Sequence, residues 1–188
     1  MTHCEGAPGL RNAVLGGLDS IEHGFYLSDD DIRLMLDHDV TLVPTLACNY
    51  GILKVVKRDP NAGIHEQSIQ VAKDLIADHA KSISKAAEAG VKIAMGSDAF
   101  GWDQGENLME LEYMVNIGFT PMDAIVAATS SAARLLGEED RLGTISTGKF
   151  ADILIVDGNP LADIRLLQDR QNLRMIMKEG VAYKNTLV

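Results

Sequence analysis

Three side chains of the kind that bind metal ions or transfer protons stand at or near the ends of short apolar segments. His23 ends one such segment and is followed at once by Gly24, and Asp98 follows the apolar run 91–95. His3 has a similar place at the start of the chain. Because a parallel α/β barrel presents its functional side chains at the carboxyl ends of its strands, this pattern predicts one shared site.

The spacing of these residues agrees with repeated strand–helix units. Twenty positions separate His3 from His23, the length of one unit, and seventy-five separate His23 from Asp98. Imidazole and carboxylate groups bind divalent ions such as zinc, which lowers the pKa of a bound water toward ~7, and a nearby aspartate can accept that water's proton. Taken singly, two of these residues have another interpretation: His23 as a core histidine bonded to a carbonyl, and Asp98 as a helix cap.

Three loop residues that follow predicted strands are candidates for substrate contact. Asn49 and Tyr50 follow the apolar segment 40–46, and Trp102 lies in the glycine-rich loop 99–105. Residues in such loops contact substrates, although loop aromatics also serve in packing. The other histidines fall in predicted helices or at their ends and are not expected to bind metal: His38, His65 and His79.

The elements that would position these residues alternate between strands and helices. Ser28 is expected to cap a helix with three aspartates in its first turn, and Thr120 with Pro121 opens another. Strands are predicted at 1–6, 18–23, 40–46 and 91–95, helices at 9–15, from 29, at 64–89, 106–117 and 120–136, and an irregular segment at 47–63. This order predicts an α/β fold with a parallel sheet and right-handed crossovers.

The character of the chain changes after Gly137. The run 153–156 predicts a buried strand, and 173–183 predicts a hairpin that turns at Glu179–Gly180. We therefore expect two parts, an α/β part over 1–140 and a small β part over 141–188.

Composition excludes several classes of function. The 188 residues are 46% hydrophobic and 23% charged, which is ordinary for a globular protein, and the net charge of −10 argues against binding nucleic acid. No segment resembles a membrane span or a secretory signal. The two cysteines have no metal-binding spacing, so free thiols in a cytoplasmic protein are expected.

Several short motifs together resemble the amidohydrolase superfamily, in particular its branch of imidazolonepropionase and prolidase-like Xaa-Pro dipeptidases. They are Thr-His-Cys-Glu-Gly-Ala (2–7), Asp-Ser-Ile-Glu-His-Gly (19–24), Gly-Ser-Asp-Ala (96–99), Gly-Lys-Phe-Ala-Asp (148–152) and Asp-Gly-Asn-Pro (157–160). The resemblance implies a (β/α)8 barrel with a small β-sandwich, and hydrolysis of amide or peptide C–N bonds by a metal-activated water. It implies that His3 and His23 bind the metal at the ends of strands five and six. Asp98, at the end of strand eight, would bind metal and act as the catalytic proton shuttle.

The family's His-x-His of strand one and lysine of strand four have no counterpart here. We therefore expect strands 5–8 of the barrel only, in a truncated chain that is inactive alone and that forms a homo-oligomer or associates with a missing N-terminal half. Zinc is the expected metal, with one or two ions in the complete enzyme, and a small molecule or dipeptide the expected substrate. The alternatives are a non-catalytic half-barrel acting as an interaction module, and a cyclic-amide hydrolase of the imidazolonepropionase type.

Overall fold

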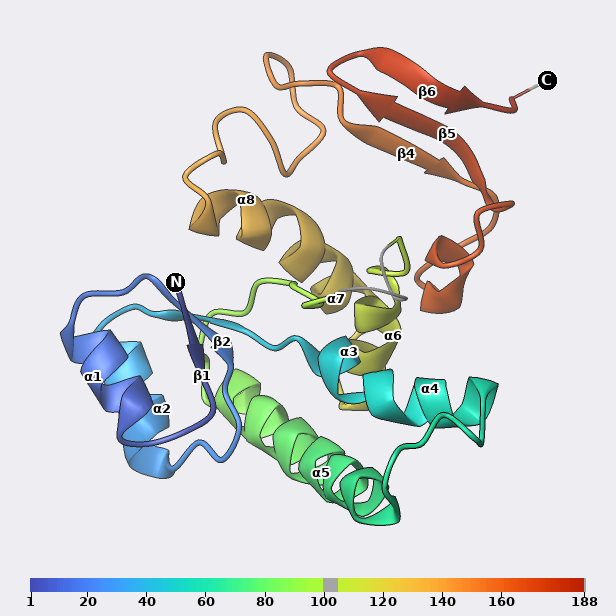
Figure 1. Cartoon of the computed structure of the whole chain (residues 1–188). Coiled ribbons are helices and arrows are strands. Elements are labelled where there is room, and N and C mark those ends of the chain that lie inside the picture. Colours follow the sequence, from blue (N-terminus) through green and yellow to red (C-terminus); the bar gives the residue numbers. More distant parts are fainter. Residues whose placement is uncertain (100–104, 188) are drawn as a thin grey trace.

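The computed structural model describes residues 1–99 and 105–187 of the chain (Figure 1). Its first sheet consists of three parallel strands in the order β1 (Thr2–Cys4), β2 (Ser20–His23) and β3 (Thr41–Val43). The helices α1 (Gly9–Leu15) and α2 (Asp29–Asp37) connect them. The predicted α/β order and parallel pairing are therefore confirmed for this part of the chain.

The predicted strand 91–95 is shorter than expected and is reduced to one parallel bridge between Leu42 and Ile93. On the β3 side, the Leu42 N–H donates to the Lys92 carbonyl at 2.8 Å, and the Ala94 N–H donates to the Leu42 carbonyl at 3.1 Å. On the other side, the Met95 N–H donates to the carbonyl of Ala127 at 2.9 Å. The segment is thus bonded to a strand on one side and to a helix on the other, so no regular ladder forms.

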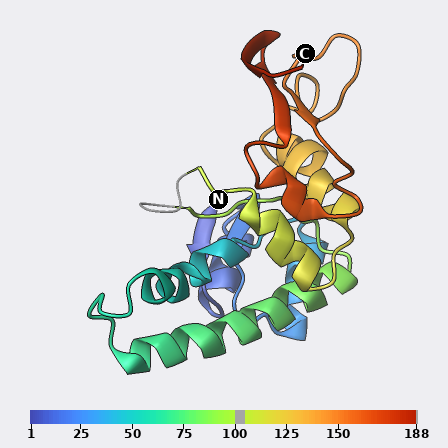
Figure 2. The same cartoon turned by 90° about the vertical axis from the view of Figure 1, so that its right-hand side faces the viewer.

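Two short helices occupy the segment that was predicted to be irregular, α3 (Leu46–Asn49) and α4 (Gly51–Arg58). The long predicted helix is confirmed as α5 (Glu66–Glu88), which lies at the end of the molecule away from the C-terminal sheet in both views (Figures 1 and 2). The helices α6 (Met109–Asn116), α7 (Pro121–Val126) and α8 (Ala132–Leu135) follow, with a π-helical turn at 127–131 between the last two.

Helix starts follow the sequence signals. Ser28 and Asp31 form a capping box at α2, and Thr120 and Asp123 form one at α7, where Pro121 is the first helical residue. Apolar side chains from the helices and from the sheet pack together, and those with at most 1% of their surface exposed include Leu10, Ile21, Met35, Leu42, Ile83, Leu111 and Met114. The core therefore lies between the parallel sheet and the surrounding helices.

The C-terminal part forms a separate antiparallel sheet, β4 (Ile153–Val156), β5 (Leu173–Lys178) and β6 (Val181–Asn185). The predicted hairpin is confirmed, and its turn residues Glu179 and Gly180 have φ of 50° and 79°, the left-handed values of a tight hairpin turn. The expectation that 153–156 is buried was wrong. Leu154 is 47% exposed, since no second sheet covers this one in the part of the chain that the structure describes.

Among the described residues, no helix is both long enough and apolar enough to cross a lipid bilayer.

Candidate functional site

His3 and His23 lie together at the carboxyl edge of the parallel sheet. Their ring centroids are 4.4 Å apart at an interplanar angle of 71°. The strand register pairs His3 with Glu22 and Cys4 with His23, so side-chain alternation alone would put the two rings on opposite faces. His23 has φ of 75°, however, and this left-handed conformation at the end of β2 accounts for its approach to His3.

The surroundings of His23 determine which ring nitrogen carries the proton. Its Nδ1 lies 2.6 Å from the hydroxyl oxygen of Thr45, and that hydroxyl donates to the carbonyl of Pro44 at 2.7 Å. Because the hydroxyl proton is used by Pro44, the Thr45 oxygen accepts from Nδ1–H of His23, which leaves the lone pair on Nε2.

The His23 side chain is suited to act as a neutral ligand or base. Only 5% of the residue is exposed. Burial, and after it the neighbouring His3, lowers the pKa of His23, while the nearby carboxyl groups of Asp98 and Glu22 oppose that shift. Near neutral pH the ring is therefore uncharged, which is the form that binds a metal ion.

Asp98 lies at the same edge, as the sequence predicted. It is exposed, with φ of 46°, and its carboxylate lies near the thiol of Cys48. Burial, and after it the neighbouring carboxylate of Asp98, raises the pKa of Cys48 to about 12, so the thiol stays neutral. Sequence reasoning treated Cys48 only as a free thiol, which it is, and overlooked its contact with the site.

A third histidine, which sequence reasoning considered only as a metal ligand and set aside, supports the site from behind. His79 on α5 has no exposed surface, and its Nε2 donates to the carbonyl of His23 at 2.8 Å. Burial lowers the pKa of His79 to about 4, so the ring stays neutral. One signal was available: His79 lies three residues after Ile76 and four before Ile83, on the apolar face of its helix.

The candidate substrate residues have different surroundings. The side-chain amide of Asn49 is 2.6 Å from Nδ1 of His79, so this side chain helps to hold the buried histidine. The half-buried ring of Tyr50 stacks on that of Tyr113, with centroids 4.0 Å apart and planes 3° from parallel. Trp102 lies outside the described residues.

The donor types at this edge fit a divalent ion, with two imidazoles and a carboxylate within electrostatic reach of one another. Within residues 1–99 and 105–187, however, no three histidine, cysteine, aspartate or glutamate side chains are close enough together to enclose an ion. The site as it stands is therefore an open pair of histidines with the aspartate beside it.

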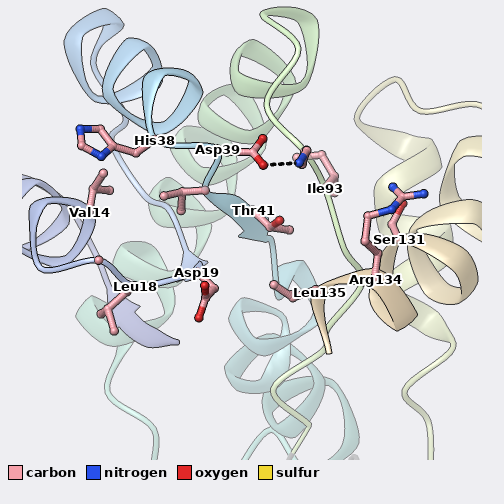
Figure 3. Close-up of a pocket in the computed structure, with 13 residues that line it drawn as sticks. Val14, Leu18, Asp19, His38, Asp39, Thr41, Ile93, Ser131, Arg134 and Leu135 are labelled. Carbon is pink, nitrogen blue, oxygen red and sulfur yellow. Dashed lines mark hydrogen bonds and ion pairs between the residues drawn. The ribbon is translucent and has the colours of Figure 1, made fainter. Parts of the chain in front are cut away.

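A cavity of about 510 Å³ lies at the opposite, amino-terminal end of the sheet (Figure 3). Asp19 and Thr41, next to the starts of β2 and β3, line it, as does the 2.6 Å ion pair between Lys92 and Asp39. His3, His23 and Asp98 are not among the residues that line it, so this cavity is distinct from the candidate site.

Comparison with known proteins places the chain in a family. A model of the amidohydrolase family matches residues 1–182. Ochratoxinase from Aspergillus niger is 29% identical over 184 residues, which cover 97% of this chain and 37% of the relative. Imidazolonepropionase from Aeromonas salmonicida is 28% identical over 160 residues, which cover 81% of this chain and 33% of the relative.

The solved structure of a Xaa-Pro dipeptidase with bound methionine in its active site is similar with a TM-score of 0.85 and 35% identity. The match covers 97% of this chain and 44% of that one, so the chain spans less than half the length of each of these three proteins. The match of the family model, which takes in both histidines and the aspartate, confirms the resemblance seen in the motifs. The chain belongs to the amidohydrolase family.

Proposed function

We propose that this chain carries part of the active site of a metal-dependent hydrolase that cleaves amide or peptide C–N bonds, with a dipeptide as substrate. His3 and His23 would bind the metal, and Asp98 would bind it and act as general base. The observation that carries this proposal is the 4.4 Å approach of the two imidazole rings at the carboxyl edge of the sheet. The similarity to a Xaa-Pro dipeptidase favours a dipeptide as substrate.

A divalent ion in this place, zinc by its ligand types, would supply a water of lowered pKa and polarise the scissile carbonyl. The chain's own residues would do the rest. Thr45 holds the Nδ1 proton of His23, so the Nε2 lone pair would be free to bind such an ion. Cys48 places a neutral thiol beside the carboxylate of Asp98, which leaves that carboxylate able to accept a proton from water.

We further propose that β1, β2, β3 and the segment 91–95 are strands five to eight of a (β/α)8 barrel, and that a second domain begins near residue 141. β1 stands at the edge of its sheet, and an unpaired edge favours pairing with another strand. The complete site would then form with a polypeptide that supplies the other strands, or in an oligomer. Two free thiols agree with a reducing, cytoplasmic setting.

Metal binding can be tested on the chain itself. We expect calorimetric titration of the chain with Zn²⁺ to show a binding site for the ion, and His23→Ala to abolish that site. His65→Ala is the matched control, because His65 is an exposed histidine at the start of α5. Equal Zn²⁺ affinity in the His23 and His65 variants would refute the assignment.

Catalysis requires the chain combined with a polypeptide that completes the barrel. In that assembly, Asp98→Ala should reduce kcat for an Xaa-Pro dipeptide by about 10²–10⁴-fold, because the general base is lost. Asp19→Ala is the control, since Asp19 is an exposed aspartate at the opposite end of the sheet. An Asp98 variant with full activity would contradict the assigned role.

The similarity to imidazolonepropionase favours a second candidate, hydrolysis of a cyclic amide by the same residues. Imidazolonepropionate assayed beside the dipeptide distinguishes the two, because the proposed dipeptidase should turn over only the latter.

A further inference from the structure

Glu110 on α6 is a buried acidic residue that the proposed chemistry does not use. It has no exposed surface, and both of its carboxyl oxygens accept backbone hydrogen bonds from the start of α3. The N–H of Leu46 donates to Oε1 at 2.8 Å, and the N–H of Ala47 donates to Oε2 at 2.7 Å. A side chain more than sixty residues away in the sequence therefore caps this four-residue helix.

The residue next to these two amides is Thr45, the partner of His23. Thr45 has φ of 53°, a left-handed conformation that a β-branched residue rarely adopts, and its own side chain makes no capping bond to α3. Such a conformation persists only where the surrounding structure imposes it. The two bonds from Glu110 hold the peptide groups that follow Thr45, so they supply part of that constraint.

A direct role of Glu110 in catalysis does not fit this geometry. Both oxygens are already engaged with backbone donors, and the group is sealed from solvent. It cannot reach substrate or water without breaking these bonds. Its influence on the site must therefore pass through the backbone of residues 45–47.

We infer that Glu110 is a positioning residue, which fixes the Nδ1-protonated form of His23 by holding Leu46, Ala47 and, through them, the hydroxyl of Thr45. This inference rests on the proposed function in so far as the Nε2 lone pair is what a metal ion requires. It follows from hydrogen-bond donors and acceptors alone, however, and holds in the chain without any metal.

The test is nuclear magnetic resonance of the ¹⁵N-labelled 188-residue chain without metal. Ring ¹⁵N shifts report the protonation of His23, and amide exchange reports the hold on Leu46 and Ala47. In the unaltered chain we expect a single Nδ1–H tautomer. In Glu110→Gln we expect exchange at both amides to be faster by on the order of tenfold, and the His23 ring to become a mixture of tautomers.

The matched control is Asp31→Asn. Asp31 is also a buried acid that accepts a backbone N–H, from Ser28 in the capping box of α2. Its replacement should lower stability and leave the His23 ring signals unchanged. Thr45→Ser, which keeps the hydroxyl, should retain the tautomer, whereas Thr45→Val should lose it.

Faster exchange at Leu46 and Ala47 with an unchanged His23 tautomer would overturn the inference and reduce Glu110 to a structural cap. A mixed tautomer in the unaltered chain would overturn it as well. If Glu110→Gln does not fold, Glu110→Asp makes the same comparison, since a shorter side chain lengthens both bonds. A single tautomer in a chain that binds no Zn²⁺ would support this inference while counting against the proposed function.

Discussion

Replacing Gly24 by alanine should destabilise the chain through two separate effects, backbone strain and a steric clash. Gly24 directly follows His23 and has φ of 73°, a conformation that costs a residue with a side chain about 1–2 kcal/mol. A Cβ atom added there would lie 2.6 Å from Cδ1 of Leu42 and 3.5 Å from Cδ1 of Leu27. Both leucines are buried, so neither can move away freely.

Forcing an extra methyl group into a packed core typically costs about 1–3 kcal/mol. Adding the backbone term gives an expected loss of about 2–5 kcal/mol in the free energy of unfolding for Gly24→Ala. Because the strain falls on the residue after His23, the variant should also displace that ring.

Two other glycines separate the two effects. Gly17 has φ of 80° with no atom within 4 Å of an added Cβ, so Gly17→Ala should show the backbone cost of about 1–2 kcal/mol alone. At Gly96 an added Cβ would lie 2.5 Å from Cγ1 of Val43 without a positive φ, so Gly96→Ala should show the steric cost of about 1–3 kcal/mol alone.

The assay is urea unfolding of all three variants at one pH, followed by circular dichroism, with stability taken from the transition midpoint and slope. We expect Gly24→Ala to lose more stability than either control. A Gly24 variant as stable as the Gly17 variant would refute the reasoning, because it would show that the site accommodates a methyl group beside the buried leucines.

Two further predictions concern buried titratable groups. Burial raises the pKa of Glu110 to about 8, against the effect of its two backbone hydrogen bonds, so its folded form binds a proton that an unfolded glutamate has already released. The contribution of Glu110 to stability should therefore be complete at low pH and fall as the pH rises. We expect the free energy of unfolding to decrease by roughly 1–2 kcal/mol between pH 6.5 and 8, and Glu110→Gln to remove this decrease in urea titrations. The pKa values of the facing Cys48 and Tyr50 are raised, so neither titrates in that range. His79→Leu leaves the carbonyl of His23 without a hydrogen-bond donor and should lower the free energy of unfolding by roughly 1–3 kcal/mol in the same measurement. His79→Gln should recover part of this loss, and unchanged stability of the leucine variant would show that the bond contributes nothing.

Local patterns were sufficient for the elements whose signals lie within a few residues. Ser28 and Thr120 start helices because their side chains bond to amides three positions on, and Glu179–Gly180 turns a hairpin because two left-handed residues fit its twist. The helix α3 could not be predicted in this way, since its first amides are bonded by Glu110, which lies on another helix. The strand 91–95 is short because it is bonded to a strand on one side and to a helix on the other, and the sequence of the segment itself does not predict these neighbours.

In the candidate site, the residue types could be predicted from the sequence, whereas their conformations could not. Residue types and spacing predicted His3, His23 and Asp98 from the sequence, but simple alternation would have kept the two histidines apart. His23 approaches His3 through its own left-handed conformation, and Thr45 and Asp98 at this edge are left-handed as well, with φ of 75°, 53° and 46° for the three residues in that order. None of the three is a glycine, so each conformation costs free energy that contacts elsewhere must offset, as strained residues at functional sites commonly require. Those contacts come from other elements: His79 on α5 bonds the carbonyl of His23, Glu110 on α6 bonds the amides after Thr45, and Cys48 on α3 lies near the carboxylate of Asp98. The geometry of the site is thus a property of the helices packed behind the sheet, and for this reason substitutions there should change the site without touching its ligands.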